Sequence, residues 1–265
     1  MKISLIITTY NWPESLLLVL ESVNHQTILP NEVIIADDGS TLETRSQVEV
    51  FQNNSELNII YSWQEDMGFR AARSRNLAIL KSTCDYIILI DGDVILDKNF
   101  VLDHIAASEQ GYFVQGSRVL LSRMQTSRAL LKKKIIFPFF SSNFKNRKNS
   151  IRSKCLSYLF SNKKNGLRGI KTCNLSFFRK DCIKINGFNN EFEGWGREDS
   201  EFAVRLINSG IKRKNIRFKA IQFHLWHNEN KRIALKKNNE MLQDSINNRI
   251  AWCENGMNSR EINES

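Results

Sequence analysis

Two aspartates separated by one glycine, Asp91 and Asp93, directly follow the apolar run Tyr86–Ile90. A short apolar run indicates a buried strand, so these carboxylates project where the chain leaves the core. Paired carboxylates with little room to hydrate favour a hard divalent cation that also binds phosphate oxygens. The simple alternative is a turn, because Asp and Gly are common turn residues. His224 and His227, beyond a later apolar run, could supply a further metal ligand or be purely structural.

Three more polar clusters follow apolar runs, at Thr8–Asn11, Asp37–Ser40 and Gln64–Gly68. In the second cluster, carboxylate oxygens could accept hydrogen bonds from a nucleoside, and Gly39 would allow close approach of the ligand. The same residues would also serve as an ordinary helix-capping turn. The clusters therefore suggest a nucleotide site only if the fold brings them together.

A fourth candidate site lies in the last third of the chain, where Gly194-Trp195-Gly196-Arg197 precedes Glu198 and Asp199. Ionised acids at the start of a helix are stabilised by the helix dipole, so a structural role is the alternative here. Two glycines around a tryptophan indicate a loop that bends or covers a ligand. Trp195 would suit stacking on the face of a sugar ring.

An alternating series of strands and helices must position these clusters. The predicted strands are Ile3–Thr9, Val33–Ala36, Asn58–Trp63 and Tyr86–Ile90, and helices are predicted between them, from Pro13 to about His25, from Thr41 to Phe51 and from about Phe69 to Lys81. Apolar strands that alternate with helices predict a parallel sheet covered on both faces. Ligands of such sheets bind beyond the carboxyl ends of the strands, where all four polar clusters of the first half lie.

The second half of the chain is predicted to contain further strands and helices. Strands are expected at Lys171–Phe178 and Arg217–His224, a short helix at Arg179–Asn186, a second helix up to Asn208, and a polar helical tail at Ala234–Arg249. No internal repeat is present.

The formal net charge of +10 comes from one segment. Between Gln110 and Lys180 there are 17 Lys or Arg residues and no acid, which leaves 21 basic and 28 acidic residues elsewhere. Basic clusters adjoin aromatic ones at Lys132–Phe140 and Lys145–Phe160. This pairing favours contact with an anionic membrane surface or an anionic acceptor, and a solvated flexible loop is the alternative.

The composition excludes several classes of protein. With 42% hydrophobic residues, the 265-residue chain is neither disordered nor collagen-like, and no apolar run approaches the roughly 20 residues of a membrane span. Five cysteines without CxxC spacing predict reduced thiols rather than a zinc site or a disulfide framework. The N-terminus enters a strand pattern at once and lacks the cleavage region of a signal peptide, so a cytosolic protein is expected. No helix-turn-helix, zinc-finger or RNP pattern indicates a nucleic-acid partner. The oligomeric state is open.

Four segments of the first half resemble the motifs of a known enzyme family. Thr8–Asn11, Asp37–Ser40, Gly68–Asn76 and Asp91–Asp93, in this order and spacing, resemble the nucleotide-sugar domain of family 2 glycosyltransferases with the GT-A fold. Gly194–Asp199, with a downstream histidine, resembles the acceptor-side motif of β-1,4-galactosyltransferases and chondroitin-type polymerase domains. Together these matches cover roughly residues 3–120 and 170–230.

The resemblance implies an α/β GT-A fold, which is a Rossmann-like, mostly parallel sheet flanked by helices, with a C-terminal acceptor-binding segment. It implies one domain in three parts. Residues 1–120 would form the nucleotide-sugar half. Residues 121–170 form a basic insert, without a counterpart in the family, for acceptor or membrane contact. Residues 171–265 would hold the catalytic and acceptor-binding segment with its helical tail.

The resemblance also implies residue roles. A UDP-sugar would be held by Thr8, Tyr10, Asp38, Asp66, Arg75 and Asp91. Mn²⁺ or Mg²⁺ would be bound by Asp93 with His224 or His227, His224 being narrowly preferred. Asp199 would be the general base, with Glu198 orienting the acceptor beside Trp195, Gly196 and Arg197. Arg197 and Ser200 stand where galactosyltransferases commonly have a glycine and an acid, which implies different acceptor contacts.

The expected activity is inverting transfer of a hexose or N-acetylhexosamine to a bacterial cell-surface glycan, such as a lipid-linked or phosphorylated precursor. The enzyme would work in the cytoplasm as a peripheral protein at the inner face of the membrane. A nucleotidyltransferase is one alternative, but residues 3–40 lack a Gly-rich phosphate loop and paired cations. A non-catalytic carbohydrate- or membrane-binding module is the other, but it would not need Asp93 and Asp199 together.

Overall fold

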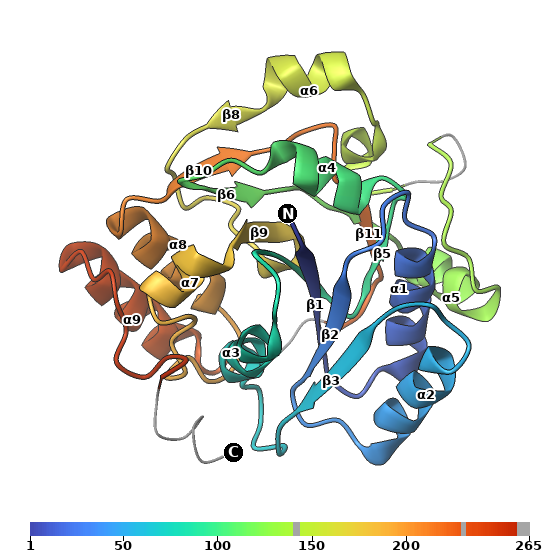
Figure 1. Cartoon of the computed structure of the whole chain (residues 1–265), viewed down its shortest axis with the longest axis horizontal. Helices are drawn as coiled ribbons and strands as arrows, with labels where there is room; N and C mark the ends of the chain where they lie inside the picture. Colours follow the sequence, from blue (N-terminus) through green and yellow to red (C-terminus); the bar gives the residue numbers. More distant parts are fainter. Residues whose placement is uncertain (140–143, 229–231, 259–265) are drawn as a thin grey trace.

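The computed structural model describes residues 1–139, 144–228 and 232–258, so that Phe140, at the end of one predicted basic and aromatic cluster, lies outside the described residues. A large sheet of eight strands runs through the molecule in the order β3-β2-β1-β4-β9-β6-β10-β8 (Figure 1). Its strands are β1 (Ile3–Thr9), β2 (Glu32–Asp37), β3 (Ile59–Trp63), β4 (Tyr86–Asp91), β6 (Tyr112–Gln115), β8 (Asn162–Lys163), β9 (Leu175–Phe178) and β10 (Lys212–Asn215).

Strand direction decides which ends of the strands meet at one edge. The strands β1 to β4 are mutually parallel, and β9 is antiparallel to both β4 and β6. Two reversals restore the direction, so β6 and its parallel neighbour β10 point the same way as β4. The carboxyl ends of β1 to β4, β6 and β10 therefore lie along one edge of the sheet, where ligands of α/β proteins bind.

Helices cover both faces of the large sheet (Figure 1). On one face, apolar residues of α1 (Pro13–Asn24), α2 (Leu42–Gln52) and α4 (Phe100–Ala107) form one core cluster with the sheet. On the other face, α3 (Ala71–Lys81), α7 (Arg179–Lys184) and α8 (Glu198–Asn208) form a second cluster. Because successive strand side chains point to opposite faces, β1 is divided between the clusters: Leu5 and Ile7 join the first, and Ile6 joins the second. The predicted α/β class, a mostly parallel sheet flanked by helices, is confirmed.

A second, three-stranded sheet has the order β5-β11-β7 and combines β5 (Val94–Leu96), β7 (Val119–Leu120) and β11 (Gln222–His224). Strand β11 pairs antiparallel with β5, and His224 lies opposite Val94 in the register. The backbone amide of Leu225 also donates to the carbonyl of Asp93 at 2.9 Å. This pairing brings residues 130 positions apart in the sequence to one place.

The basic insert contains short helices and a strand. It holds α5 (Arg123–Leu131), a 3₁₀ turn at Arg147–Ser150, α6 (Lys154–Phe160) and the edge strand β8. Helix α6 lies at the periphery of the molecule, beyond β8 and β10 (Figure 1). No helix in the described part of the chain is long and apolar enough to span a membrane.

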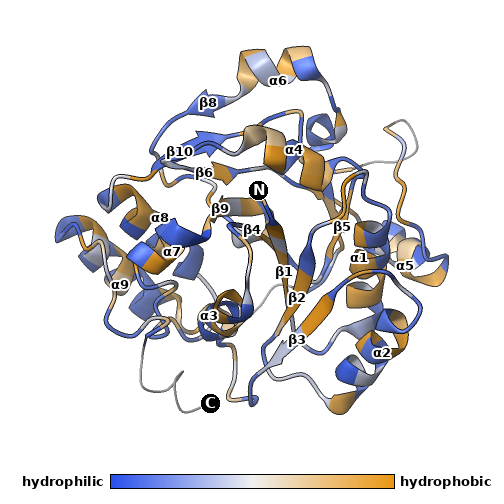
Figure 2. Ribbon diagram, in the orientation of Figure 1, coloured by the Kyte–Doolittle hydropathy of each residue, from blue (hydrophilic) through white to orange (hydrophobic). Residues whose placement is uncertain are grey.

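The second half differs from its predicted elements in three places. A 3₁₀ turn at Thr172–Asn174 shortens the strand expected from Lys171, and only Gln222–His224 of the strand expected from Arg217 is extended. Strand β10 has the sequence Lys-Arg-Lys-Asn and is hydrophilic in Figure 2, as is β8. The hydropathy of the sequence therefore did not indicate that β10 is a strand. The tail forms α9 (Leu235–Asn247), as predicted, but it packs on α8.

Candidate active site

Three potential metal ligands meet beyond the end of β4. The Oδ2 atom of Asp93 lies 3.1 Å from Nε2 of His227 and 3.4 Å from Nε2 of His224. One donor atom from each residue falls within 4.8 Å of the others. The sequence left a choice between the two histidines, and the structure places both beside the carboxylate. A carboxylate with two imidazoles is a donor set suited to a divalent transition metal.

The same cluster contains an unsatisfied acceptor. Asp93 Oδ1 is buried and has no hydrogen-bond partner among the residues that the structure describes. Burial opposes ionisation of Asp93, but His224 and His227 outweigh it and keep the pKa of this carboxyl below its ordinary value. A hydrogen bond to Asp93 raises the pKa of His227 to about 9. A buried acceptor without a donor is costly unless something fills the position, and a cation would do so.

Glycine between the two aspartates is explained by close packing. A Cβ atom on Gly92 would lie 3.0 Å from Thr9 Oγ1 and 3.1 Å from the carbonyl oxygen of Thr8. The Gly92 amide donates to that carbonyl at 2.7 Å, and its own carbonyl accepts from Ser15 Oγ at 2.7 Å. The motif is thereby fixed to β1 and α1 through its backbone.

Arg75 connects the carboxylates of the site to one another. This buried guanidinium lies 3.7 Å from Asp91 Oδ1 and 3.3 Å from Glu198 Oε1, and its Nε donates to Thr8 Oγ1 at 3.2 Å. Burial, together with the neighbouring charge of Asp93, raises the pKa of Asp91 to about 6, and Arg75 opposes this rise. Arg75 thus links the end of β4 to the start of α8.

Several of the residues predicted to hold the UDP-sugar lie at the carboxyl ends of β1 to β3. Tyr10, half of whose surface is exposed, donates from its hydroxyl to Asp66 Oδ2 at 2.9 Å. Asp38 accepts from Gln64 Nε2 at 2.5 Å and from the backbone amide of Arg70 at 2.9 Å. Burial raises the pKa of Asp38 to about 6. Each of its oxygens keeps a second lone pair for a ligand.

Glu198 and Asp199 occupy the first turn of α8, as the sequence indicated. Desolvation by burial, followed by the charge of Glu198, raises the pKa of Asp199 to about 7. Ser200 Oγ donates to Asp199 Oδ1 at 3.1 Å, while Glu198 Oε2 is buried and meets no hydrogen-bond partner in the ranges that the structure describes. A carboxylate held in this way is more basic than one in water, which suits proton abstraction.

The loop before α8 is covered by α9. Gly194 has a φ of +72°, and a Cβ atom there would lie 2.6 Å from Cβ of Ala234. Asn238, fully buried, donates to the carbonyl of Gly196 at 2.8 Å. Arg197 Nε donates to Asn239 Oδ1 at 2.6 Å. Trp195 remains partly exposed, with the guanidinium of Arg232 5.5 Å from the centre of its ring.

The structure therefore brings the candidate residues to the predicted edge, in two groups joined by Arg75. Three contributing residues were missed in the sequence. Gln64 positions Asp38, Arg232 faces Trp195, and the charge of Arg118 reaches Asp91 and Asp93. Only Gln64 had a sequence signal, since it follows a predicted strand.

Comparisons with known proteins agree with this arrangement. Residues 4–183 match the family model described as glycosyl transferase family 2, and residues 156–228 match the model described as the N-terminal domain of galactosyltransferase. The chain is 27% identical over 225 residues to chondroitin synthase from Escherichia coli, covering 78% of this chain and 32% of that protein. It is 28% identical over 238 residues to hyaluronan synthase from Pasteurella multocida, covering 81% and 24%. The chain thus spans about a third or less of these relatives.

Solved structures share the fold. TarS from S. aureus (residues 1–349) in complex with UDP superposes with a TM-score of 0.65 and 16% identity, covering 94% of this chain and 65% of that one. The mannosyltransferase PcManGT from Pyrobaculum calidifontis, in complex with GDP-Man and Mn²⁺, gives a TM-score of 0.57 and 15% identity, covering 84% and 56%. Because the first family model matches more than half of the chain, the expected resemblance is confirmed: the chain belongs to glycosyl transferase family 2.

Proposed function

We propose that the protein transfers a hexose or N-acetylhexosamine from a UDP-sugar to a hydroxyl group of a bacterial cell-surface glycan, with inversion at the anomeric carbon. The observation that carries this proposal is that both His224 and His227 lie at the carboxylate of Asp93. The raised pKa of Asp199 supports a general base in the same protein. Residues 1–120 would act as the donor half, 121–170 as the acceptor or membrane contact, and 171–265 as the catalytic and acceptor segment.

The donor half would hold the nucleotide. Thr8, Tyr10, Asp38 and Asp66 line the ends of β1 to β3, where a uridine would meet carboxylate and hydroxyl oxygens. Arg75 would act through Asp91, which would lie near the ribose or the metal. S. aureus TarS, which shares this fold, has been solved in complex with UDP and with UDP-GlcNAc.

The residues present fit a divalent metal. The partnerless Asp93 Oδ1 and the two imidazoles offer three ligand groups, a set better suited to Mn²⁺ than to Mg²⁺, which prefers oxygen ligands. We therefore place Mn²⁺ at Asp93, His224 and His227, with Mg²⁺ as the alternative. When bound, the metal would act as a Lewis acid that offsets negative charge on the departing diphosphate.

Asp199 would be the general base. It would take the proton of the acceptor hydroxyl as that oxygen forms a bond to the anomeric carbon and the bond to the UDP oxygen breaks. One displacement inverts the configuration, so an α-linked UDP-sugar would give a β-glycoside. Glu198, with a free buried oxygen, would orient the acceptor, and Trp195 with Gly196 and Arg197 would contact its sugar.

Contact with the cytoplasmic face of a membrane would bring the enzyme to lipid-linked acceptors such as lipooligosaccharide, O-antigen or capsule precursors. Tyr158, Leu159 and Phe160 are exposed on the peripheral helix α6, within the segment that lacks acidic residues. Apolar side chains beside lysine and arginine suit the interface of an anionic bilayer.

A thermal-shift screen tests the donor and metal assignments. The protein would be heated with UDP-Glc, UDP-Gal, UDP-GlcNAc, UDP-GalNAc, UDP-GlcA, GDP-sugars or CMP-sugars, each with Mn²⁺ and with EDTA. A ligand at 100 times its dissociation constant stabilises a protein by about 2.7 kcal/mol. We expect a Mn²⁺-dependent shift with a UDP-sugar, and the absence of a shift with every nucleotide would contradict the proposal.

Two histidine variants sharpen that screen. His227→Ala should abolish the Mn²⁺-dependent part of the shift, because it removes one of three ligand groups. His25→Ala replaces an exposed histidine at the carboxyl end of α1 that pairs with Glu21, and this matched control should keep the shift. An undiminished shift in His227→Ala would remove His227 from the metal site.

A further inference from the structure

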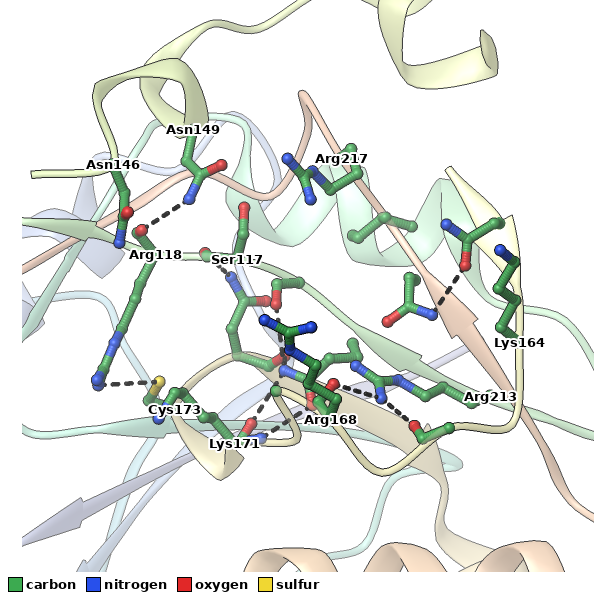
Figure 3. Close-up of a pocket in the computed structure, with 18 of the residues that line it drawn as sticks. Ser117, Arg118, Asn146, Asn149, Lys164, Arg168, Lys171, Cys173, Arg213 and Arg217 are labelled. Carbon is green, nitrogen blue, oxygen red and sulfur yellow. Dashed lines mark hydrogen bonds between the residues drawn. The ribbon is translucent and has the colours of Figure 1, made fainter. Parts of the chain in front are cut away.

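A cavity of about 580 Å³ opens beside the candidate active site (Figure 3). Its walls come from the residues after β6, from the loop between β8 and β9, and from β10 and the residues that follow it. Because β6 and β10 run parallel to β4, these walls lie at the same edge of the sheet as Asp91. The cavity is thus on the side of β4 away from the nucleotide residues of β1 to β3.

The lining of this cavity is strongly cationic. It contains six basic side chains and no carboxylate: Arg118, Lys164, Arg168, Lys171, Arg213 and Arg217. Figure 3 shows these side chains distributed around the cavity, with Arg168 between Arg118 and Arg213. Asparagine and glycine residues complete most of the wall, so the surface offers many more donors than negative charges.

These six cations have no ion pairs among the described residues. Their neighbours do: Arg152 lies 2.7 Å from Asp103, and Lys163 and Lys214 lie 2.6 and 3.0 Å from Glu109. Charges next to the cavity are therefore compensated within the protein, and those facing it are not. A cluster of uncompensated cations destabilises a fold by mutual repulsion, so a negatively charged occupant would relieve it.

Arg213 is a buried residue in the wall of the cavity. Its side chain is 5% exposed and donates to the carbonyls of Gly166 and Arg168, the latter at 3.0 Å. Its Nε is buried and has no hydrogen-bond partner within the described part of the chain. Burial of this charge lowers the pKa of Arg213. A buried guanidinium that meets only carbonyl dipoles is expected to take an oxyanion when one is present.

Arg118 and Cys173 join the cavity to the active site. Both line the cavity, and Arg118 Nη1 lies 4.0 Å from Cys173 Sγ. Cys173 lies in the 3₁₀ turn Thr172–Asn174, which contacts β4, the strand that ends at Asp91. A molecule seated in the cavity would therefore extend directly toward the carboxylates.

We propose that this cavity binds an oxyanion group, a phosphate or a carboxylate, of the acceptor chain. This assignment rests on the proposed transferase function, and adds to it a site for a charged acceptor separate from the donor nucleotide. The planar forks of arginine recognise both groups through paired hydrogen bonds. A volume of about 580 Å³ is larger than a single phosphate needs, so a sugar or polyol unit would enter with the charged group.

The test uses direct binding to the full chain, saturated with UDP and Mn²⁺, at about 150 mM salt, on the order of physiological ionic strength. The probes are a ribitol-phosphate oligomer, a chondroitin oligosaccharide without sulfate, and a neutral dextran oligosaccharide. The variant is Arg168→Gln with Lys171→Gln, since both side chains are exposed and lack a structural partner among the described residues. The control is Lys180→Gln with Lys184→Gln, on α7.

We expect wild type to bind one charged probe more tightly than dextran, and the cavity variant to bind that probe about 10- to 100-fold more weakly. The control should be unchanged. Preference for the phosphate probe or for the uronate probe identifies the group, and either supports the site. Equal binding of all three probes, or an equal loss in the control, would overturn it.

Two donor-side readouts separate this proposal from the proposed function. UDP affinity and hydrolysis of the UDP-sugar without acceptor should be the same in wild type, variant and control. Loss of UDP affinity in the cavity variant would mean that the cavity holds the donor diphosphate, which contradicts an acceptor site. If wild type binds a charged probe but no nucleotide, the transferase function fails while the oxyanion site stands.

Discussion

At the residue scale, the two neighbouring acids of the site, Glu198 and Asp199, have different electrostatic environments. Glu198 Oε1 lies 3.3 Å from Arg75, which compensates its charge, whereas Asp199 has no ion pair among the described residues and accepts only from Ser200. The pKa of Asp199 is raised to about 7 by burial and by Glu198. Glu198 is therefore held by Arg75 in a positioning role, and Asp199 is basic enough to accept a proton.

Asp199→Asn should abolish sugar transfer without weakening the binding of the donor nucleotide. The amide keeps the shape and the hydrogen bond from Ser200 but cannot take a proton, so we expect kcat to fall by about 10²- to 10⁴-fold. UDP affinity, measured by calorimetry with Mn²⁺, should be unchanged. The control is Asp85→Asn at the opposite, exposed end of β4. A variant that loses UDP binding along with transfer would contradict the role of general base.

Asp199 should also make the ligand-free protein less stable as the pH rises. Its folded-state pKa of about 7 lies above the ordinary value of 3.8, so its contribution is greatest below pH 3.8 and is lost as the pH rises through 7. The amide of the Asp199→Asn variant does not titrate. The Tm of this variant relative to wild type should therefore increase between mildly acidic and mildly alkaline pH, in scanning calorimetry. A difference in Tm that is constant with pH would contradict the burial of this charge.

At the scale of elements, two packing arrangements assemble the site. Pairing of β11 with β5 delivers the histidines to Asp93, and α9 holds the loop before α8 through Asn238. Helix α9 is therefore part of the active-site architecture. Ser245, also on α9, donates to Glu201, which forms a buried ion pair with Arg205 inside α8.

Substitutions at two glycines of similar backbone conformation test the contact between the loop and α9. Gly194 (φ +72°) and Gly111 (φ +77°) would both strain an alanine, but only at Gly194 does the new Cβ meet another atom, 2.6 Å away. Urea unfolding should show a loss of about 1 to 2 kcal/mol for Gly111→Ala and about 2 to 4 kcal/mol for Gly194→Ala. Transfer activity should fall only in Gly194→Ala. Equal losses would show that the close approach to α9 is unimportant.

At the scale of the whole molecule, positive charge is concentrated in one segment of the chain. The segment from Gln110 to Lys180 carries 17 cations and no acid, so all 28 acidic residues lie outside it. Part of this positive charge lines the cavity beside the active site, and part lies at the periphery with the exposed apolar residues of α6. An anionic acceptor at an anionic surface would meet the molecule on this side.

Removing the apolar surface of α6 should weaken membrane binding. In flotation with vesicles that contain anionic lipids, wild type should rise with the lipid, and Leu159→Ser with Phe160→Ser should remain largely at the bottom. Leu42→Ser with Val50→Ser removes similarly exposed apolar side chains from α2, away from the basic segment, and should float. Failure of wild type to float would argue for an acceptor that is free in solution.

Local physical chemistry explains what the sequence by itself determined. Apolar runs at Ile3–Thr9 and Tyr86–Asp91 can only be buried strands, and polar residues immediately after such strands must emerge at one edge of a parallel sheet. The α/β class followed from alternating strands and helices, and the family from the resemblance of four ordered motifs, Thr8–Asn11, Asp37–Ser40, Gly68–Asn76 and Asp91–Asp93; both are confirmed.

Long-range packing decided the rest. Both histidines reach Asp93 only because β11 pairs with β5 in one register, and no local pattern specifies a pairing between segments 130 residues apart. Strand β10 is polar and had no hydropathy signal, yet it forms a wall of the cationic cavity. Charge composition revealed that the insert is basic. Which cations are neutralised by Asp103 and Glu109, and which face an open cavity, depends on distances that exist only in the folded chain.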